Sequence, residues 1–306
     1  METIIGRKEE KIILEEALKT KEAGLIAVYG RRRVGKTFLI RNFFEERLVF
    51  ELTGMYKGSL KDQLLHFSGS LQKATGSTLA LTSPKSWVEA FHALEQFLEN
   101  LPKRKKSVIF LDEFPWLDGR KSGFLSAFEH FWNSWASRQT HLLFVICGSA
   151  ASWMIQHIVN NKGGLHHRIT QKMKLMPFTL VETEIYLRSK GCDLDRYQIL
   201  QIYMAMGGIP QYLNTVQKGD SASQVIEKTC FKKDGLLNKE FDNIYNSLFE
   251  MANNHLKAVR VLAAEPKGLT RGEIIEQCGF SSGGRTTMML DELEQSGFIR
   301  SNKNYD

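Results

Sequence analysis

Hydrophobic residues in the first 178 positions fall into short continuous runs, separated by longer stretches with helical spacing. The runs predict fully buried strands, because they do not alternate polar with apolar positions. Strands are expected at residues 25–29, 48–52, 108–111 and 142–146, with a weaker fifth at 171–175. Helices are expected at residues 9–19, 37–46, 87–100 and 124–135, with a less regular helical insertion over 53–84. The alternation predicts an α/β fold, with a parallel sheet covered by helices on both faces.

The strand pattern stops after Phe178. Residues 179–250 predict a helical lid with helices at 180–190, 195–206 and 221–228. Residues 251–306 predict three further helices, at 255–265, 270–278 and 282–296, and then a strand at 298–301. Three short helices followed by a strand are typical of a winged helix-turn-helix. The chain is therefore expected to form three domains: 1–178, 179–250 and 251–306.

A strand runs directly into the segment Gly30-Arg-Arg-Arg-Val-Gly-Lys-Thr37, and a helix follows it. This segment fits the phosphate-binding pattern G-x-x-x-x-G-K-[ST]. Glycines let backbone N–H groups surround a phosphate, and a helix N-terminus adds partial positive charge. Lys36 is expected to reach the β- and γ-phosphates, and the Thr37 hydroxyl to bind Mg²⁺. The residues expected to contact the nucleotide here are Gly30, Arg33, Val34, Gly35, Lys36, Thr37 and Phe38.

A second predicted strand ends in two carboxylates, Asp112 and Glu113. The carboxyl ends of parallel strands open on the edge of the sheet where ligands bind. Asp112 is therefore expected to orient Mg²⁺ and its waters, and Glu113 to polarise the attacking water. Ser149 follows the next strand along the chain. It is expected either to hydrogen-bond the γ-phosphate or the water, or to cap the following helix.

Composition narrows the class of protein. The chain has 306 residues, 42% of them hydrophobic and 25% charged, as in ordinary globular proteins. Its four scattered cysteines fit a reducing compartment, no apolar run approaches the roughly 20 residues of a membrane span, and the N-terminus lacks signal-peptide features. A cytoplasmic location without membrane attachment is expected.

The formal net charge of +7 is unevenly distributed. Residues 1–178 contain 26 Lys and Arg against 17 Asp and Glu, whereas residues 255–306 contain seven of each sign. The excess lies where a polyanionic nucleotide would bind, so it does not by itself indicate DNA binding.

Four motifs together resemble the archaeal-type ATPases of the STAND branch of AAA+-like P-loop NTPases. They are Ile4-Ile-Gly-Arg-Lys-Glu9, the arginine-rich phosphate loop, Asp112-Glu-Phe-Pro-Trp-Leu117 and Gly207-Gly-Ile-Pro-Gln-Tyr-Leu213. The resemblance implies that Ile5, Gly6 and Arg7 help enclose the adenine. It also implies that Pro210 packs against the base. Independently of any nucleotide, Gly207 is expected to end one helix and Pro210 to start the next.

The resemblance also draws attention to Arg168, which stands where the family often has an arginine before its last core strand. This arginine either senses the γ-phosphate, acts as a finger across an interface in a homo-oligomer, or is an ordinary surface residue. In relatives a nuclease-like domain commonly follows the winged helix. This chain stops at Asp306, so either such a domain is absent or the chain is a truncated form.

The sequence leaves the function open between three classes. The first is an ATP-hydrolysing switch that contacts double-stranded DNA, with Arg285, Thr286 and Thr287 facing the major groove. The second is a nucleotide-gated signalling switch whose winged helix contacts a protein. The third, a small-molecule kinase, fits less well, because Glu113 lies beside Asp112 and a helical lid and winged helix follow. In each class the ligands are ATP or ADP and Mg²⁺, and slow turnover is expected.

Overall fold

The computed structural model describes residues 3–160, 163–165, 167–238, 240, 245, 248–249 and 252–302. The chain forms two compact units, each described separately below. The first unit comprises Met1–Gly30, Gly35–Ser149 and Trp153–Leu175. The second comprises Arg31–Val34, Ala150–Ser152 and Met176–Asp306. The short segment Arg31–Val34 in the middle of the phosphate loop thus belongs to the second unit.

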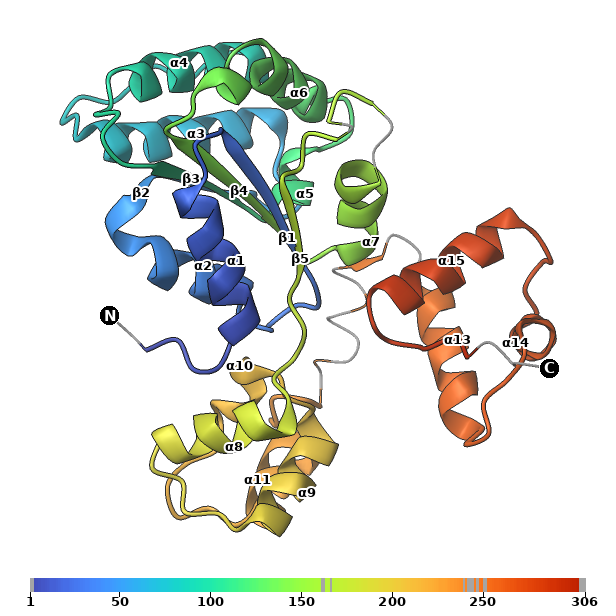
Figure 1. Cartoon of the computed structure of the whole chain (residues 1–306). Helices are drawn as coiled ribbons and strands as arrows, with labels where there is room; N and C mark the ends of the chain where they lie inside the picture. Colours follow the sequence, from blue (N-terminus) through green and yellow to red (C-terminus); the bar gives the residue numbers. More distant parts are fainter. Residues whose placement is uncertain are drawn as a thin grey trace. The chain divides into compact units, whose positions relative to one another are not determined.

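A five-stranded parallel sheet forms the centre of the first unit (Figure 1). Its strands are β1 (Gly24–Tyr29), β2 (Leu48–Thr53), β3 (Ser107–Asp112), β4 (Leu142–Gly148) and β5 (Gln171–Lys174). All five predicted strands are confirmed. They lie in the order β2-β3-β4-β1-β5. Since β4 pairs with both β1 and β3 in parallel, the phosphate loop after β1 and the carboxylates after β3 emerge on the same edge.

Helices cover both faces of this sheet (Figure 1). The helices are α1 (Lys8–Lys19), α2 (Lys36–Phe44), α3 (Leu60–Thr75), α4 (Trp87–Glu99), α5 (Phe114–Leu117), α6 (Phe124–Ser134) and α7 (Ala151–Met154). Helices α3, α4 and α6 form the layer on one face, and α1 and α2 lie on the other. The four helices predicted within residues 1–178 are confirmed, and the irregular insertion contains the regular helix α3. The predicted α/β class is therefore confirmed.

Aromatic side chains fill the core beneath α4 and α6. Phe114, the first residue of α5, lies 4.9 Å from Phe124 and 5.2 Å from Phe128, measured between ring centroids. Phe114 is fully buried, and burying such a side chain contributes about 1.5–3 kcal/mol. The residue that precedes it, Glu113, is thus attached to a firmly packed helix.

The second unit is helical within its described residues. Its helices are α8 (Leu180–Ser189), α9 (Arg196–Met206), α10 (Pro210–Leu213), α11 (Ala222–Ile226), α13 (Ala252–Ala264), α14 (Arg271–Cys278) and α15 (Gly284–Gln295). One cluster of buried hydrophobic residues lies between 178 and 225, and another lies between 245 and 293. The boundaries predicted at 178 and 250 stay predictions, and residue 250 lies outside the described part.

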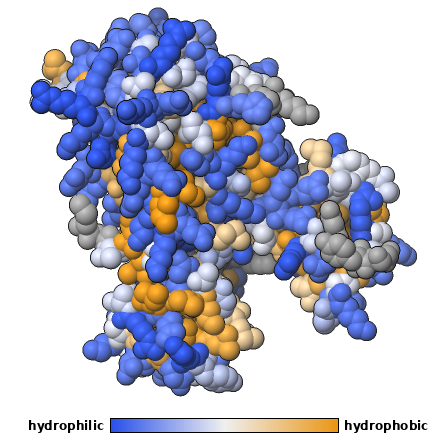
Figure 2. All heavy atoms as spheres, viewed as in Figure 1, coloured by the Kyte–Doolittle hydropathy of each residue, from blue (hydrophilic) through white to orange (hydrophobic). Residues whose placement is uncertain are grey.

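Orange surface lies over the part of the chain that contains α8 and α9 in the space-filling view (Figure 2). Both helices carry exposed apolar or aromatic side chains. These are Leu180, Val181 and Ile185 on α8, and Tyr197, Leu200 and Met204 on α9. Across the residues that the structure describes, no helix combines the length and the hydrophobicity that crossing a membrane demands.

The predicted strand at residues 298–301 is wrong, since the described residues there form no strand. Gly297 has a left-handed backbone (φ 76°) that ends α15. The Phe298 N–H then donates to the Leu293 carbonyl at 2.9 Å, and the Ser301 N–H donates to the Glu294 carboxylate at 3.1 Å. Both N–H groups therefore bond back to α15 instead of a neighbouring strand. The winged-helix assignment stays a prediction for this module, which is defined here as α13, α14 and α15.

Candidate nucleotide-binding site

Gly30 begins the phosphate loop at the end of β1. Its φ is +146°, and a Cβ atom placed there would lie 2.3 Å from the Leu175 carbonyl oxygen. The Leu175 N–H donates to the Tyr29 carbonyl at 2.7 Å, which holds the two backbone segments together. Only glycine fits between them, so the sequence requirement at this position follows from a close approach of two backbones.

The far end of the loop turns sharply into α2. Gly35 has φ 90° and is the N-cap of the helix, and Arg33, two residues earlier, also has a positive φ of 69°. Backbone N–H groups beside left-handed residues form a concave anion-binding surface, and the helix N-terminus adds its partial positive charge. The loop therefore has the backbone conformation that a phosphate cradle requires.

Lys36 is buried, although it carries a positive charge. Its Nζ donates to the Gly30 carbonyl oxygen at 3.0 Å, so the side chain folds back across the loop that it follows. A buried ammonium group is stable only with polar or anionic partners. This arrangement places the amine over the cradle, where the sequence predicted that it would meet phosphate.

Asp112, at the end of β3, is the next charged group of the site. Its Oδ2 accepts a hydrogen bond of 2.7 Å from the Thr37 hydroxyl, and its Oδ1 accepts one of 2.9 Å from the Glu113 N–H. The two residues predicted to bind Mg²⁺ are thus in direct contact, although 75 positions separate them in the chain. One hydroxyl and one carboxylate are hard oxygen ligands that suit Mg²⁺, which usually keeps several waters and phosphate oxygens as its other ligands.

The Glu113 carboxylate accepts hydrogen bonds from Ser149, the residue that follows the neighbouring strand β4. The Ser149 hydroxyl donates to its Oε1 at 2.7 Å, and the Ser149 N–H donates to its Oε2 at 3.3 Å. Ser149 follows β4, which pairs with β3 alongside, so the sheet brings the two residues together. The roles predicted for Ser149, toward the γ-phosphate, the water or the next helix, stay predictions. Its hydroxyl binds the carboxylate of the expected base.

Cys147 lies near these carboxylates but does not add reactive chemistry. Burial, and then the nearby Asp112 carboxylate, raise the pKa of its thiol well above the usual value. The thiol therefore stays protonated near neutral pH and behaves as a packing group.

The Arg33 side chain makes its contacts within the second unit. Its Nη1 lies 2.7 Å from Oε2 of Glu240, and its guanidinium carbon lies 5.8 Å from the centroid of the Tyr212 ring. Among the described groups Nη1 has no acceptor in hydrogen-bond geometry, so the contact with Glu240 is an ion pair and not a directed hydrogen bond. Because the Arg33 side chain contacts Glu240 and Tyr212, the backbone N–H of Arg33 is the group suited to bind a phosphate.

The residues expected around the adenine adopt unusual backbone conformations. Gly6 and Arg7 both have left-handed backbones, with φ of 64° and 56°, and the Arg7 side chain is buried and paired with Glu10 at 3.3 Å. Ile5 is half-buried and Phe38 is exposed. Their proposed contact with the base stays a prediction.

In the second unit, Gly207 ends α9 with φ 60°, and Pro210 is the first residue of α10. The structural interpretation of the Gly-Gly-Ile-Pro segment is thus confirmed. A Cβ on Gly208 would lie 1.8 Å from the Phe178 carbonyl oxygen, which explains the second glycine. The adenine contact of Pro210 stays a prediction.

Arg168 is exposed and lies in the turn that leads into β5. Thr170, two residues later, bonds to Leu25 near the start of β1, whereas the phosphate loop follows the end of that strand. Arg168 therefore lies toward the opposite edge of the sheet from the loop. This placement does not support γ-phosphate sensing within one chain, while a role across an interface stays a prediction.

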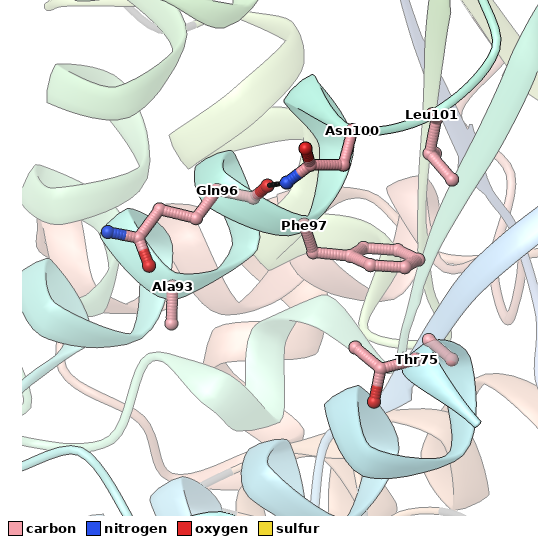
Figure 3. Close-up of a pocket in the computed structure, with 7 residues that line it drawn as sticks. Thr75, Ala93, Gln96, Phe97, Asn100 and Leu101 are labelled. Carbon is pink, nitrogen blue, oxygen red and sulfur yellow. Dashed lines mark hydrogen bonds between the residues drawn. The ribbon is translucent and has the colours of Figure 1, made fainter. Parts of the chain in front are cut away.

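A groove of about 440 Å³ lies between the ends of α3 and α4 (Figure 3). Thr75, Gln96, Phe97 and Asn100 are among its lining residues, and none of the seven lining side chains is charged. A polyphosphate would need cationic or backbone N–H partners, so this groove is not the nucleotide site.

Two buried residues that contact segments of the site could not be identified from the sequence. Gln63, on α3, makes three hydrogen bonds around the turn that starts at Glu113. Glu240 pairs with Arg33 from more than 200 positions away. Neither belongs to a motif, and the first lies in a segment whose pattern predicted only an irregular insertion, so only a structure reveals them.

A parallel sheet with a glycine-bounded loop after one strand and a hydroxyl-bound aspartate after another defines a P-loop nucleoside-triphosphatase fold. Residues 5–216 match the family described as an ATPase domain predominantly from Archaea. The chain belongs to this family, and the predicted resemblance to archaeal-type ATPases is confirmed.

Two proteins of Methanocaldococcus jannaschii are similar in sequence. An uncharacterized protein is 26% identical over 290 residues, which cover 95% of this chain and 60% of that protein. An uncharacterized ATP-binding protein is 49% identical over 45 residues, which cover 15% of this chain and 76% of that protein. The chain therefore spans less than two thirds of the longer relative's length.

Two solved structures share the fold. The Walker-type ATPase of Pyrococcus abyssi has a TM-score of 0.66 at 19% identity, covering 98% of this chain and 92% of that one. The ORC2 protein of Aeropyrum pernix, in ADPNP–ADP complexes, has a TM-score of 0.57 at 14% identity, covering 97% of this chain and 89% of that one. At these identities the likeness concerns the fold alone.

Proposed function

We propose that this protein binds ATP with Mg²⁺ and hydrolyses it slowly, as a nucleotide-dependent switch. The observation that carries the proposal is the pair of contacts at the strand ends. Asp112 binds the Thr37 hydroxyl at 2.7 Å, and Glu113, the next residue, is held by Ser149 at 2.7 Å. A metal-binding pair and a base held separately are what hydrolysis of a phosphoanhydride requires.

Binding of the triphosphate would use the loop and its lysine. The backbone N–H groups from Arg33 to Thr37 would surround the β-phosphate, and the Lys36 amine would move from the Gly30 carbonyl to the β- and γ-phosphate oxygens. Thr37 and Asp112 would hold Mg²⁺, which supplies charge neutralisation for the phosphates. Ile5, Gly6, Arg7, Phe38 and Pro210 would enclose the adenine.

Hydrolysis would use Glu113 as the general base. Its carboxylate would accept a proton from the water that attacks the γ-phosphorus, and the bond from the γ-phosphorus to the bridging oxygen would break to leave ADP. The two donors of Ser149 would keep the carboxylate pointed in one direction throughout. Positioned general bases contribute roughly 10²- to 10⁴-fold to a rate.

The C-terminal module, α13 to α15, would transmit the nucleotide state to DNA or a protein partner. The predicted DNA-contacting residues are not all available, because Thr286 is only 7% exposed and its hydroxyl donates to the Ser281 carbonyl at 2.7 Å. Thr287 accepts a hydrogen bond from Arg271 at 3.0 Å, and Arg285 is exposed. Of the three predicted residues, Arg285 and Thr287 are therefore the two exposed to a partner.

The central test compares the unmodified chain with Lys36→Ala. The unmodified chain should bind MgATP and release inorganic phosphate, and the variant should do neither while keeping its far-ultraviolet circular dichroism. Absence of MgATP affinity in the unmodified chain would refute the proposal.

A salt titration of duplex binding distinguishes a DNA partner from a protein partner, because phosphate contacts produce a steep decline of log K with log salt.

A further inference from the structure

Gln63 is a buried glutamine whose side-chain amide uses both its oxygen and its NH₂ group in hydrogen bonds. It lies on α3 and is only 2% exposed. Its Oε1 accepts from the Met55 N–H at 3.1 Å, and its Nε2 donates to the Met55 carbonyl at 2.8 Å and to the Trp116 carbonyl at 2.9 Å. Three segments therefore meet at one side chain: helix α3, the loop after β2 eight positions earlier, and α5, whose Trp116 lies 53 positions further along the chain.

Such an amide resists displacement. A buried donor or acceptor left without its partner costs about 1–3 kcal/mol, and here one acceptor and two donors would lose their partners together. The paired bonds to Met55 also imitate the contact that a neighbouring strand would make with that residue. Gln63 therefore fixes the position of the Met55 backbone relative to Trp116.

Both partners of Gln63 lie next to the Asp112–Glu113 peptide. The Trp116 N–H donates to the Glu113 carbonyl at 2.9 Å. Gly54, which precedes Met55, donates its N–H to the Asp112 carbonyl at 2.8 Å. A Cβ on Gly54 would lie 2.4 Å from the Glu113 carbonyl oxygen, so these backbones are in direct contact. Gln63 thus joins the two segments that enclose the backbone of Glu113.

The backbone of Glu113 requires such support. Its φ and ψ are both 45°, in the left-handed region, which costs a residue other than glycine about 1–2 kcal/mol. Conformations of this kind persist only where the surroundings enforce them. Relaxation of this turn would redirect the carboxylate that Ser149 holds, although no residue of the phosphate loop would move.

We propose that Gln63 is a positioning residue for ATP hydrolysis, acting through Met55 and Trp116 to hold the turn that directs the Glu113 carboxylate. This inference rests on the proposed hydrolytic function and adds to it a residue outside the recognised motifs. Gln63 would govern the rate of the chemical step and not the affinity for nucleotide.

The test replaces Gln63 by methionine, which has similar length but no amide, in the full chain. Gln63→Met should lower kcat roughly 10- to 100-fold, because a small displacement of a catalytic group has effects of this size. The Kd for MgATP should stay unchanged. Gln63→Asn keeps an amide one methylene shorter and should have a smaller effect, which covers the case in which the methionine variant folds poorly.

Gln72→Met is the matched control. Gln72 lies on the same helix and donates to the Ser77 carbonyl at 3.3 Å, away from Glu113, so its replacement should leave kcat unchanged. In the Glu113→Gln background, Gln63→Met should produce no further loss of the residual rate, since the base that it positions is gone. If Gln63→Met instead reduced only the amount of folded protein, it would lower the hydrolysis rate by the same factor with and without Glu113→Gln.

The outcomes separate the two proposals. Hydrolysis by the unmodified chain, together with an unchanged kcat in folded Gln63→Met and Gln63→Asn, would overturn the positioning role alone. A weaker Kd for MgATP with unchanged kcat would also overturn it. No hydrolysis by the unmodified chain would overturn the proposed function and this inference with it.

Discussion

The Ser149 hydroxyl lies 2.7 Å from Oε1 of Glu113, and its backbone N–H reaches the other carboxylate oxygen at 3.3 Å. Two donors on one residue thereby define both the position and the rotation of the carboxylate. The two residues follow adjacent parallel strands, so their contact depends on the register of β3 with β4. This relationship supports the proposed division of roles, in which Asp112 serves the metal and Glu113 the water.

Replacement of Glu113 by glutamine should separate binding from hydrolysis. The amide keeps the shape of the side chain but accepts a proton poorly, so hydrolysis should fall roughly 10²- to 10³-fold. MgATP affinity, measured by isothermal titration calorimetry, should remain close to that of the unmodified chain. Hydrolysis at the unmodified rate would show that another group is the base.

Replacement of Ser149 by alanine should have a milder effect. It removes the 2.7 Å hydrogen bond but leaves the backbone N–H in place, so kcat should fall about tenfold. Ser149→Thr retains a hydroxyl and should recover most of the rate. Phosphate-release assays at saturating MgATP measure both variants, and an equal loss in the threonine variant would contradict the role of the hydroxyl.

The contact between Thr37 and Asp112 predicts a metal-dependent nucleotide affinity. In the unmodified chain, removal of Mg²⁺ with EDTA should weaken ATP binding. Asp112→Asn should bind ATP with an affinity that responds much less to Mg²⁺, because a neutral amide is a poorer ligand than a carboxylate. Kd values with and without the metal provide the measurement. An unaltered response in the variant would remove Asp112 from the metal site.

Gly30→Ala should disrupt both the fold and the site. Its Cβ would lie 2.3 Å from the Leu175 carbonyl at a φ of +146°, so the loop or β5 must shift. We expect a lower melting temperature and loss of MgATP binding. Gly69→Ala on α3, where a Cβ meets open space, is the control and should not destabilise the protein, since alanine favours helices.

The Arg33–Glu240 ion pair should stabilise the second unit. Glu240 is almost fully buried, and Glu240→Gln removes the charge that faces Arg33, so the free energy of unfolding should fall by about 2 kcal/mol. This value is below that of a fully buried pair, because Arg33 is partly exposed to solvent. Glu184→Gln breaks the exposed pair with Arg188 and should cause no measurable loss in the same chemical denaturation experiment.

The local pattern of residues predicted most of the helices and strands of this protein. Hydrophobic runs located β1 to β4 clearly, because a strand buried on both faces has few polar positions. The edge strand β5 is Gln-Lys-Met-Lys and mostly exposed, so its signal was weaker. The phosphate loop was predicted from Gly30, Gly35, Lys36 and Thr37, because its backbone requires particular residue types at fixed spacing. Asp112 and Glu113 were identified from their position at the end of a hydrophobic run.

Only the tertiary structure decided what these residues contact. The strand order brings Ser149 to Glu113 and Thr37 to Asp112, and no local pattern encodes which strands are neighbours. Gln63 offered no signal, because a buried glutamine and an exposed one look alike in a sequence. The strand expected at residue 298 failed for the same reason: a strand needs a partner, and here the free N–H groups bond back to α15. Local chemistry specifies which residues can act, and long-range pairing determines which of them meet.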